Sequence, residues 1–341
     1  MESIYWVLTW ACHRRCVHCY DDRFRPYVRE EFSRVVGEGQ GAYARIIANL
    51  PDDLSFIDRH GARKRGQIIF AGGELLLDGV REALFYPVLD AVRARYGDRS
   101  PRLGVQTTGD ILTLSHVKEM IAHGVHTIAI ASIDDYHAGL EGDKKFRLME
   151  KVRAIMREAG VEEVTLGGKF DKRLDMPAPR ERADPDAPCF LFFGAQPDLW
   201  IGELWPRGRA FANGLSKATY ADNFCARWSG GKSFLDYGKA GSEIAIEPDG
   251  SVYPCCLKTK APLGNLTEER LTDILDDLRN EPALAAINDG DPERMGETYG
   301  WTRAEFEKRS EAADGTGALR KNVCLGCDAF FEARLGDILR R

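Results

Sequence analysis

The feature that most constrains the fold is a regular alternation of short apolar runs with longer amphipathic stretches through the first 170 residues. The short runs have the length of buried strands, whereas the longer stretches repeat their apolar residues at helical spacing. Strands and helices that alternate in this way form a parallel sheet, either as a barrel or as a doubly wound sheet. We expect strands at residues 4–9, 67–71, 102–107, 126–132 and 161–166, and helices at 78–95, 115–123 (capped by Ser115) and 144–159.

Each of the first four expected strands ends in residues suited to binding or chemistry. In parallel α/β folds, functional sites lie at the carboxyl ends of the strands. We therefore expect these four strand ends to meet at one mouth. They carry, in order, Cys12, Cys16 and Cys19; Gly72-Gly73-Glu74; Thr107-Thr108-Gly109; and Ser132 with Asp134.

The three cysteines that follow the first strand have the spacing C-x3-C-x2-C. Three thiols cannot all pair as disulfides, and three thiolates are one ligand short of a closed tetrahedral zinc site. They suit an iron–sulfur cluster with one iron left open to another ligand. The alternative is a zinc site completed by a distant ligand, such as His13 or His18.

The composition is that of a soluble cytoplasmic protein. The chain has 341 residues and a formal net charge of -6, which argues against a nucleic-acid partner. Its first apolar stretch, residues 4–11, is too short to span a membrane and lacks a signal-peptide cleavage pattern, so we expect no membrane partner. In a reducing cytoplasm, nine cysteines are metal ligands or reactive thiols more often than disulfides.

The pattern changes in the second half of the chain. A proline-rich, charged segment covers residues 171–197, and the alternation of strands and helices is lost from about residue 220. A hairpin is expected at 244–254, with Pro248-Asp249-Gly250 as its turn, and a helix at 267–280, capped by Thr267. We expect two domains, residues 1–219 and a smaller one at 220–341.

The cysteine loop followed by a Gly-Gly-Glu strand end resembles the radical S-adenosylmethionine (SAM) superfamily. The resemblance implies a partial (β/α)6 TIM-like barrel over the first domain. It also implies a 4Fe-4S cluster on Cys12, Cys16 and Cys19, with SAM on the open iron, and a reductant such as flavodoxin or ferredoxin. The residues that it places at SAM are Gly72, Gly73, Glu74, Thr107, Ser132, Asp134, His18 and Arg209.

A second resemblance rests on Gly250-x4-Cys255 and on the pair Cys324-x2-Cys327. These features are similar to the SPASM extension of radical SAM enzymes, or to its shorter form, twitch. The resemblance implies a small α+β domain with an auxiliary, second 4Fe-4S cluster. Its expected ligands are Cys225, Cys255, Cys324 and Cys327, and the alternative is a zinc site on the same four thiols.

Two cysteines are left over. Cys189 and Cys256 are the candidates for a catalytic role, either as a hydrogen-atom donor or as a ligand of the substrate. The alternative for each is a buried thiol that acts as a small hydrophobic side chain.

The family resemblance implies a radical SAM enzyme that modifies a small natural-product precursor or a peptide. One alternative starts from Cys255-Cys256, since vicinal thiols bind soft elements. It resembles arsinothricin biosynthesis, in which the 3-amino-3-carboxypropyl group of SAM would be transferred to trivalent arsenic. The non-enzymatic alternative is a zinc or iron–sulfur protein with a structural or electron-transfer role.

Overall fold

The computed structural model describes residues 1–165, 182, 184–194, 204–227 and 232–338. Nine strands within these residues form one sheet, in the order β11-β10-β9-β1-β4-β5-β6-β8-β7. Every neighbouring pair from β9 to β7 is parallel, and only the pairs that involve β10 are antiparallel. The protein is therefore of the mixed α/β class with a mainly parallel sheet, as predicted; the number of barrel units stays a prediction.

The first four parallel strands confirm the sequence pattern. They are β1 (Ser3–Val7), β4 (Gln67–Ala71), β5 (Arg102–Thr107) and β6 (Val125–Ile130). Side chains alternate across each strand. In β5, Leu103 and Val105 pack into the core, whereas Gln106 faces the opposite side of the sheet.

The last two parallel strands differ from expectation. The strand predicted at 161–166 is only β7 (Glu162–Glu163), at the edge of the sheet. β8 (Cys189–Phe192), which comes later in the chain, lies between β6 and β7. The four residues of β8 are all buried, and an apolar strand suits an interior position better than the acidic β7 does.

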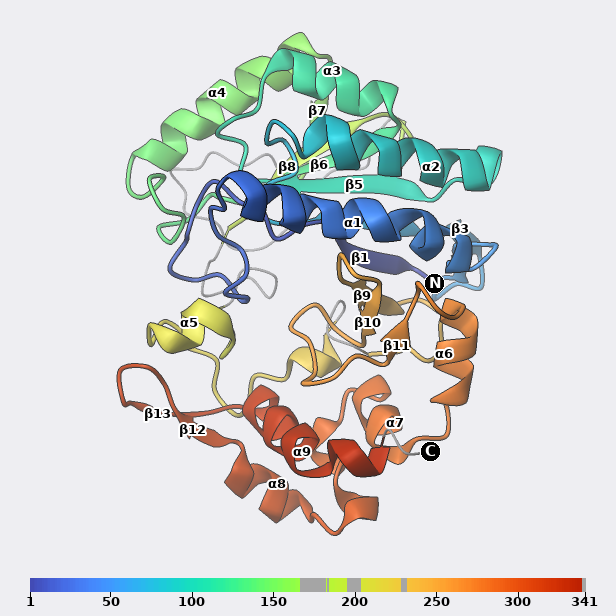
Figure 1. Ribbon diagram of the computed structural model, residues 1–341, viewed down its shortest axis with the longest axis vertical. Helices are drawn as coiled ribbons and strands as arrows, with labels where there is room; N and C mark the ends of the chain where they lie inside the picture. Colours follow the sequence, from blue (N-terminus) through green and yellow to red (C-terminus); the bar gives the residue numbers. More distant parts are fainter. Residues whose placement is uncertain (166–181, 183, 195–203, 228–231, 339–341) are drawn as a thin grey trace.

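Helices of the N-terminal half cover one side of this sheet (Figure 1). They are α1 (Arg29–Asn49), α2 (Tyr86–Tyr96), α3 (Leu114–Ala122) and α4 (Lys144–Glu158). The helix predicted at 78–95 instead begins as one π-helical turn, η1 (Arg81–Phe85), which leads into α2. The cap of α3 is Thr113, whose hydroxyl accepts a hydrogen bond from the His116 amide, so the prediction of Ser115 was wrong. A short hairpin, β2 (Ser55–Ile57) with β3 (Arg63–Arg65), precedes β4.

The C-terminal half continues the same sheet. The predicted hairpin is confirmed as β9 (Glu243–Ile246) and β10 (Ser251–Tyr253), followed by β11 (Gly264–Asn265). β9 also pairs in parallel with β1, from Ser3 opposite Glu243 to Trp6 opposite Ile246. The predicted boundary at 219/220 falls between α5 (Gly208–Ala212) and the 3-10 turn η4 (Phe224–Ala226), and it stays a prediction.

The remaining helices lie beside β11 and below the sheet in Figure 1. The predicted helix at 267–280 is α6 (Leu271–Asp277), which begins after Arg270, so Thr267 is not its cap. The amide and hydroxyl of Thr267 instead bond to the Asn265 side chain in the preceding turn. The later elements are α7 (Pro282–Asn288), α8 (Arg303–Arg309), the hairpin β12 (Glu311–Ala313) with β13 (Leu319–Lys321), and α9 (Val323–Ile338).

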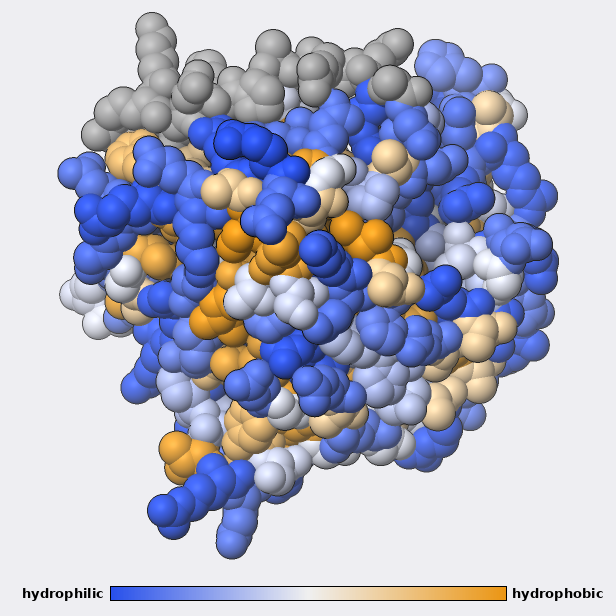
Figure 2. Space-filling view, turned by 90° about the horizontal axis from the view of Figure 1, so that it is seen from above, coloured by the Kyte–Doolittle hydropathy of each residue, from blue (hydrophilic) through white to orange (hydrophobic). Residues whose placement is uncertain are grey.

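The outer face seen in Figure 2 is largely hydrophilic, with apolar side chains gathered near its middle. Among the residues that the structure describes, no helix has both the length and the apolar character needed to cross a bilayer.

Candidate functional site

A cavity of about 270 Å³ opens at the carboxyl ends of β1, β4, β5 and β6. It lies on the side of the sheet that the helices leave free, because Tyr5, Ile69 and Gln106, which alternate with core residues, line it. Nine of the predicted site residues also line it: Cys12, Cys16, His18, Cys19, Gly72, Gly73, Thr107, Asp134 and Cys256. The strand ends therefore meet as predicted.

Cys12, Cys16 and Cys19 form what we call the N-terminal thiol site. The loop that carries them is fixed by backbone contacts, in which Cys12 N donates to Arg25 O (3.1 Å) and Glu74 N donates to Ala11 O (2.9 Å). A Cβ atom on Gly73 would overlap the Ala11 carbonyl group. The Gly-Gly pair is therefore required because the end of β4 passes directly against the cysteine loop.

The three thiols of this site have different electrostatic surroundings. A hydrogen bond from Cys19 is the main cause that lowers the pKa of Cys16 to about 6; burial opposes it, and His137 and the Ala138 amide add to it. The same hydrogen bond, followed by burial, raises the pKa of Cys19. Burial raises the pKa of Cys12 to about 12. The folded loop therefore stabilises one thiolate, at Cys16, before any metal binds.

Glu74 lies inside the protein and bonds to the neighbouring strand end, and its contact with SAM stays a prediction. Its carboxylate is fully buried and is not among the described residues that line the cavity. It accepts hydrogen bonds from Thr107 Oγ1 (2.8 Å), Thr108 N (2.8 Å), Thr108 Oγ1 (2.7 Å) and Leu76 N (3.0 Å). Glu74 thus joins the end of β4 to the end of β5. Ser132 acts similarly, since its hydroxyl donates to Thr108 O (2.6 Å).

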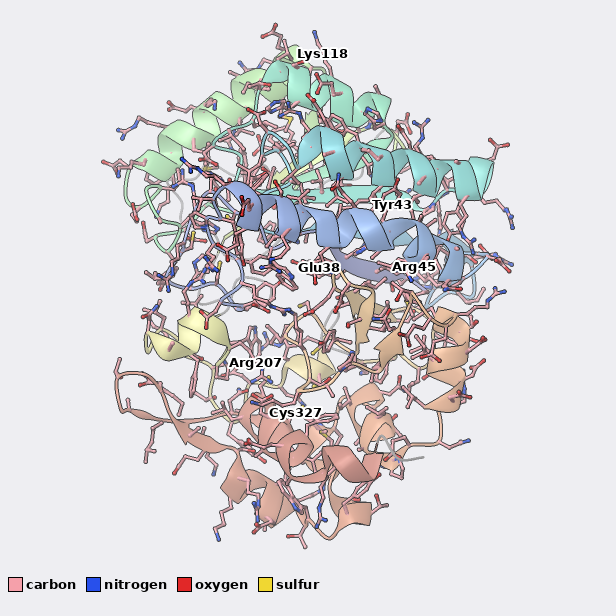
Figure 3. The ribbon with its side chains drawn as sticks, in the orientation of Figure 1. Glu38, Tyr43, Arg45, Lys118, Arg207 and Cys327 are labelled. Atoms are coloured by element: carbon pink, nitrogen blue, oxygen red, sulfur yellow. The ribbon has the colours of Figure 1, made fainter. Side chains whose placement is uncertain are left out.

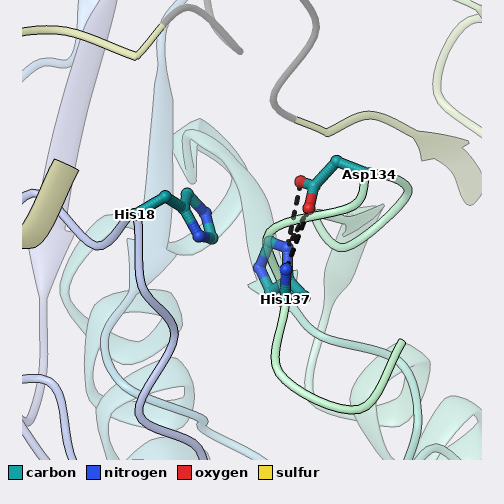
Figure 4. Close-up of side chains that lie close together, drawn as sticks. All are labelled: His18, Asp134 and His137. Carbon is teal, nitrogen blue, oxygen red and sulfur yellow. Dashed lines mark hydrogen bonds and ion pairs between the residues drawn. The ribbon is translucent and has the colours of Figure 1, made fainter. Parts of the chain in front are cut away.

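Asp134 forms a cluster with two histidines (Figure 4). Its carboxylate oxygens lie 2.9 and 3.0 Å from His137 Nδ1, and the ring centroids of His18 and His137 are 4.5 Å apart. Burial and the charge of His137 lower the pKa of His18 to about 4, so His18 is neutral at pH 7. Burial opposes protonation of His137, but Asp134 and Cys16 outweigh it and raise its pKa.

Donor atoms of His18, Asp134 and His137 lie within 4.8 Å of one another, a spacing that could hold a metal ion. The Asp134 carboxylate already bonds to His137, and His137 lies near enough to Cys16 to lower the pKa of that thiol. The sequence reasoning missed His137. Its signal was a histidine three residues after the strand-end aspartate.

His13, considered above as a fourth zinc ligand, bonds instead to Asp110. His13 Nε2 lies 2.9 Å from Asp110 Oδ2, and Arg14 Nη2 donates to the same oxygen at 2.6 Å. Asp110 therefore holds the beginning of the cysteine loop against the end of β5.

Arg209 also holds the loop instead of lining the cavity. Its guanidinium donates to the carbonyl oxygens of Cys16 (2.7 Å), Asp22 (3.2 Å) and Phe24 (2.7 Å). Its side chain is buried, and these carbonyl groups take three of its five N–H donors, so a contact of Arg209 with SAM stays a prediction.

Cys225, Cys255, Cys324 and Cys327 form what we call the C-terminal thiol site. All four are buried, and none is among the described residues that line the cavity. They lie close enough to affect one another: burial is the main cause that raises the pKa of Cys225, and the other three thiols raise it further. Cys225 thus lies with the other three. Trp205, Phe224 and Leu257 pack around Cys255 and Cys324.

Arg207 is a buried cation that adjoins this second site. Figure 3 labels Arg207 beside Cys327, near the beginning of α9. Arg207 donates to Asp328 Oδ2 (2.9 Å), Cys324 O (3.0 Å) and Leu257 O (3.2 Å).

Cys256 and Cys189, which belong to neither thiol site, have different surroundings. Cys256 lines the cavity beside Tyr5, Tyr20 and Glu243, whereas its neighbour Cys255 belongs to the C-terminal thiol site. Cys189 begins β8, and its thiol lies 3.7 Å from Thr127 Oγ1, at the end of the strands opposite the cavity mouth. The geometry therefore favours Cys256 over Cys189 as a residue that meets a substrate.

Comparisons with known proteins agree with the second site. A model of the SPASM family, an iron-sulfur cluster-binding domain, matches residues 239–295, which contain Cys255 and Cys256. The match confirms the cluster-binding domain of SPASM type that the sequence predicts here. A search of curated proteins gave no match.

Three solved structures are similar to the chain at low identity. BtrN in complex with AdoMet and 2-DOIA is 13% identical, with a TM-score of 0.42 over 89% of this chain and 92% of that one. Native anSMEcpe with bound AdoMet is 14% identical, with a TM-score of 0.46 over 100% and 98%. Streptococcus suis SuiB bound to its precursor peptide SuiA is 12% identical, with a TM-score of 0.39 over 84% and 66%.

Proposed function

We propose that this chain is a radical SAM enzyme with two iron–sulfur clusters. One observation carries the proposal: three thiols from one loop face the same cavity as the glycine pair of β4, Thr107 and Asp134, while four other thiols are sealed away from it. A site with three protein ligands beside a cavity leaves a coordination position for a further ligand, whereas four buried thiols make a closed site.

The N-terminal thiol site fits a 4Fe-4S cluster by its donors. Cys16 already favours the thiolate, and metal binding needs deprotonated sulfur. When bound and reduced, the cluster supplies the electron that cleaves SAM, and the resulting 5′-deoxyadenosyl radical takes a hydrogen atom from the substrate. Arg209, Asp110 and Glu74 keep the loop and the strand ends in place around it.

Residues of the cavity wall suit SAM. Gly72 and Gly73 present backbone without side chains, which allows a ligand to approach closely. Neutral His18 offers an aromatic face for the adenine ring, and the carboxylate of Asp134 offers negative charge to a cationic ligand.

The substrate would occupy the part of the cavity between the N-terminal thiol site and Cys256. Tyr5, Tyr20 and the buried Glu243 line this part with polar groups, and Trp205 and Leu257 line it with apolar ones. Such a mixed lining suits a small natural-product precursor or one residue of a peptide. We propose a small, low-potential reductant such as flavodoxin or ferredoxin as the electron donor. Nine free thiols suit a reducing compartment such as the cytoplasm.

The test is anaerobic reconstitution with iron and sulfide, followed by dithionite and SAM. We expect about eight Fe per chain and release of 5′-deoxyadenosine by the wild type. Replacing Cys12, Cys16 and Cys19 with Ala should abolish this release, whereas the control Cys189→Ala should retain it. A fully reconstituted wild type that leaves SAM intact would contradict the proposal. Methylthioadenosine as the product would instead indicate transfer of the aminocarboxypropyl group.

A further inference from the structure

One short segment, residues 206–209, contacts both thiol sites. On one side, Arg209 N donates to Cys19 O (2.8 Å), and the Arg209 guanidinium donates to Cys16 O and Phe24 O. Gly208 has φ +49°, and a Cβ atom there would overlap the backbone of Cys19 and Tyr20. The segment is therefore packed tightly against the loop of the N-terminal thiol site.

On the other side, Arg207 contacts the C-terminal thiol site. Its Nη2 donates to Cys324 O (3.0 Å) and its Nε to Leu257 O (3.2 Å), so it joins the two stretches that carry Cys324 and Cys255. Its side chain is 11% exposed. Both acceptors are neutral carbonyl groups, so these two bonds leave the positive charge of Arg207 uncancelled.

The charge of Arg207 is therefore available to the surrounding anions. Asp328 is paired with it at 2.9 Å, and Cys324, Cys327 and Cys255 are close enough to raise its pKa against the effect of burial. The other charged groups that act on Asp328 are Lys260 and Glu332. An arginine stays charged throughout the pH range of proteins, so a fixed positive charge lies beside the four thiols.

The potential of an iron–sulfur cluster depends on its net charge, on hydrogen bonds and on exposure to solvent. A reduced cluster carries one more negative charge than an oxidised one, so a neighbouring cation favours reduction and a neighbouring anion opposes it. Arg207 and Asp328 would act on a cluster here with opposite signs.

We propose that Arg207 is a positioning residue that makes the second cluster easier to reduce and, through its chain neighbour Arg209, holds that cluster in a fixed place relative to the first. The inference rests on the proposed function, because it requires a cluster on the C-terminal thiol site. It assigns to residues 206–209 the role of a rigid link along which the two sites are coupled.

The experiment uses the full-length chain with Cys12, Cys16 and Cys19 replaced by Ser, so that only the second cluster gives a signal. Its midpoint potential is measured by dye-mediated titration followed by electron paramagnetic resonance, with iron counted in each sample. The variants are Arg207→Gln, Arg207→Lys and Asp328→Asn. The control is Arg320→Gln, since the guanidinium of Arg320 pairs with Asp314 and bonds to Gly214 O.

We expect Arg207→Gln to make reduction at least tenfold less favourable, which is about 59 mV for one electron. Asp328→Asn should shift the potential in the opposite direction, Arg207→Lys should stay nearer the wild type than Arg207→Gln, and the control should not move. A purely structural role would lower the iron content without opposite shifts.

The inference is overturned if Arg207→Gln keeps its iron at an unchanged potential, or if the Gln and Asn variants shift the same way. If Arg207→Gln loses its iron, Asp328→Asn provides the test. A midpoint potential that does not rise in Asp328→Asn overturns the inference. If the Ser background binds no iron at all, the proposed second cluster itself is wrong.

Discussion

The two thiol sites of this chain differ in whether their thiols line the cavity. The N-terminal site puts three thiols on the wall of a cavity and holds their loop from outside through Arg209 and Asp110. The C-terminal site encloses four thiols among apolar side chains, with the guanidinium of Arg207 bonded beside them. An open site can bind a reactant, whereas a closed one can store charge or stabilise the fold.

The comparison shows that the pKa of a thiol follows from what surrounds it as well as from its depth. Cys16 is 3% exposed, yet its neighbours lower its pKa to about 6. Cys255 and Cys324 are also buried, and burial raises their pKa values to about 11 and about 12. Where burial outweighs the effect of donors and of Arg207, as at Cys255, the thiol keeps its proton until a metal binds.

The largest expected effect comes from removing two of the four thiols of the C-terminal thiol site. In the double variant Cys324→Ser, Cys327→Ser, iron should fall from about eight to about four per chain, because half the ligands of the second cluster are gone. SAM cleavage at the N-terminal site should persist. Iron analysis and 5′-deoxyadenosine assays check this, and simultaneous loss of both clusters would contradict the assignment of separate ligand sets to the two clusters.

The next effect comes from the link between the sites. Gly208→Ala adds a Cβ atom at positive φ against the Cys19 backbone, so we expect a loss of more than about 2 kcal/mol in the free energy of unfolding. Gly238→Ala is the control, because open space surrounds that glycine and its φ is not positive. Denaturant titration measures both, and equal stability of the two variants would argue against tight packing at Gly208.

A smaller loss of stability is expected from Glu74→Gln, beside the N-terminal thiol site. The amide cannot accept all four hydrogen bonds that the carboxylate accepts, so a loss of about 2 kcal/mol is expected. Thermal unfolding of the metal-free protein provides the measurement. If Glu74 instead served only to bind SAM, the metal-free variant would unfold like the wild type.

The smallest effect concerns protonation. In metal-free protein, the thiolate fraction of Cys16 rises as pH increases through about 6, so its alkylation should reach half its maximal rate near pH 6. The raised pKa values of Cys255 and Cys324 should leave both unlabelled at pH 8. Mass spectrometry after brief iodoacetamide treatment distinguishes the sites. His137→Gln should move the Cys16 midpoint upward, and an unmoved midpoint would exclude a contribution from His137.

Much of the open site could be predicted because its signals are local. The cysteine spacing, the Gly-Gly pair and Asp134 each follow a strand, and parallel strands bring their ends together. The roles of Glu74 and Arg209 could not be predicted in the same way. Apart from the Leu76 amide, their partners lie 33 or more residues away in the chain, and sequence does not show which carbonyl group or hydroxyl a buried side chain will reach.

The sequence pattern also could not predict the order of the strands in the sheet. The pattern of residues 161–166 indicated a strand, but it could not show that β8 would lie between β6 and β7. Likewise, the hairpin at β9 and β10 was predicted, but its pairing with β1 depends on a contact across about 240 residues. Local periodicity predicts elements, whereas their neighbours are decided by tertiary packing.

The pairing of β1 with β9 has a practical consequence for dissecting the protein. β1 is bonded on both sides, to β4 and to β9, so a chain that ends at residue 219 would leave one side of β1 bare. An unpaired, apolar strand edge invites pairing with other molecules and aggregation. The cysteine loop that follows β1 would then sit on the least protected strand of such a fragment. The N-terminal half would therefore need either β9 or a substitute strand in order to be handled alone.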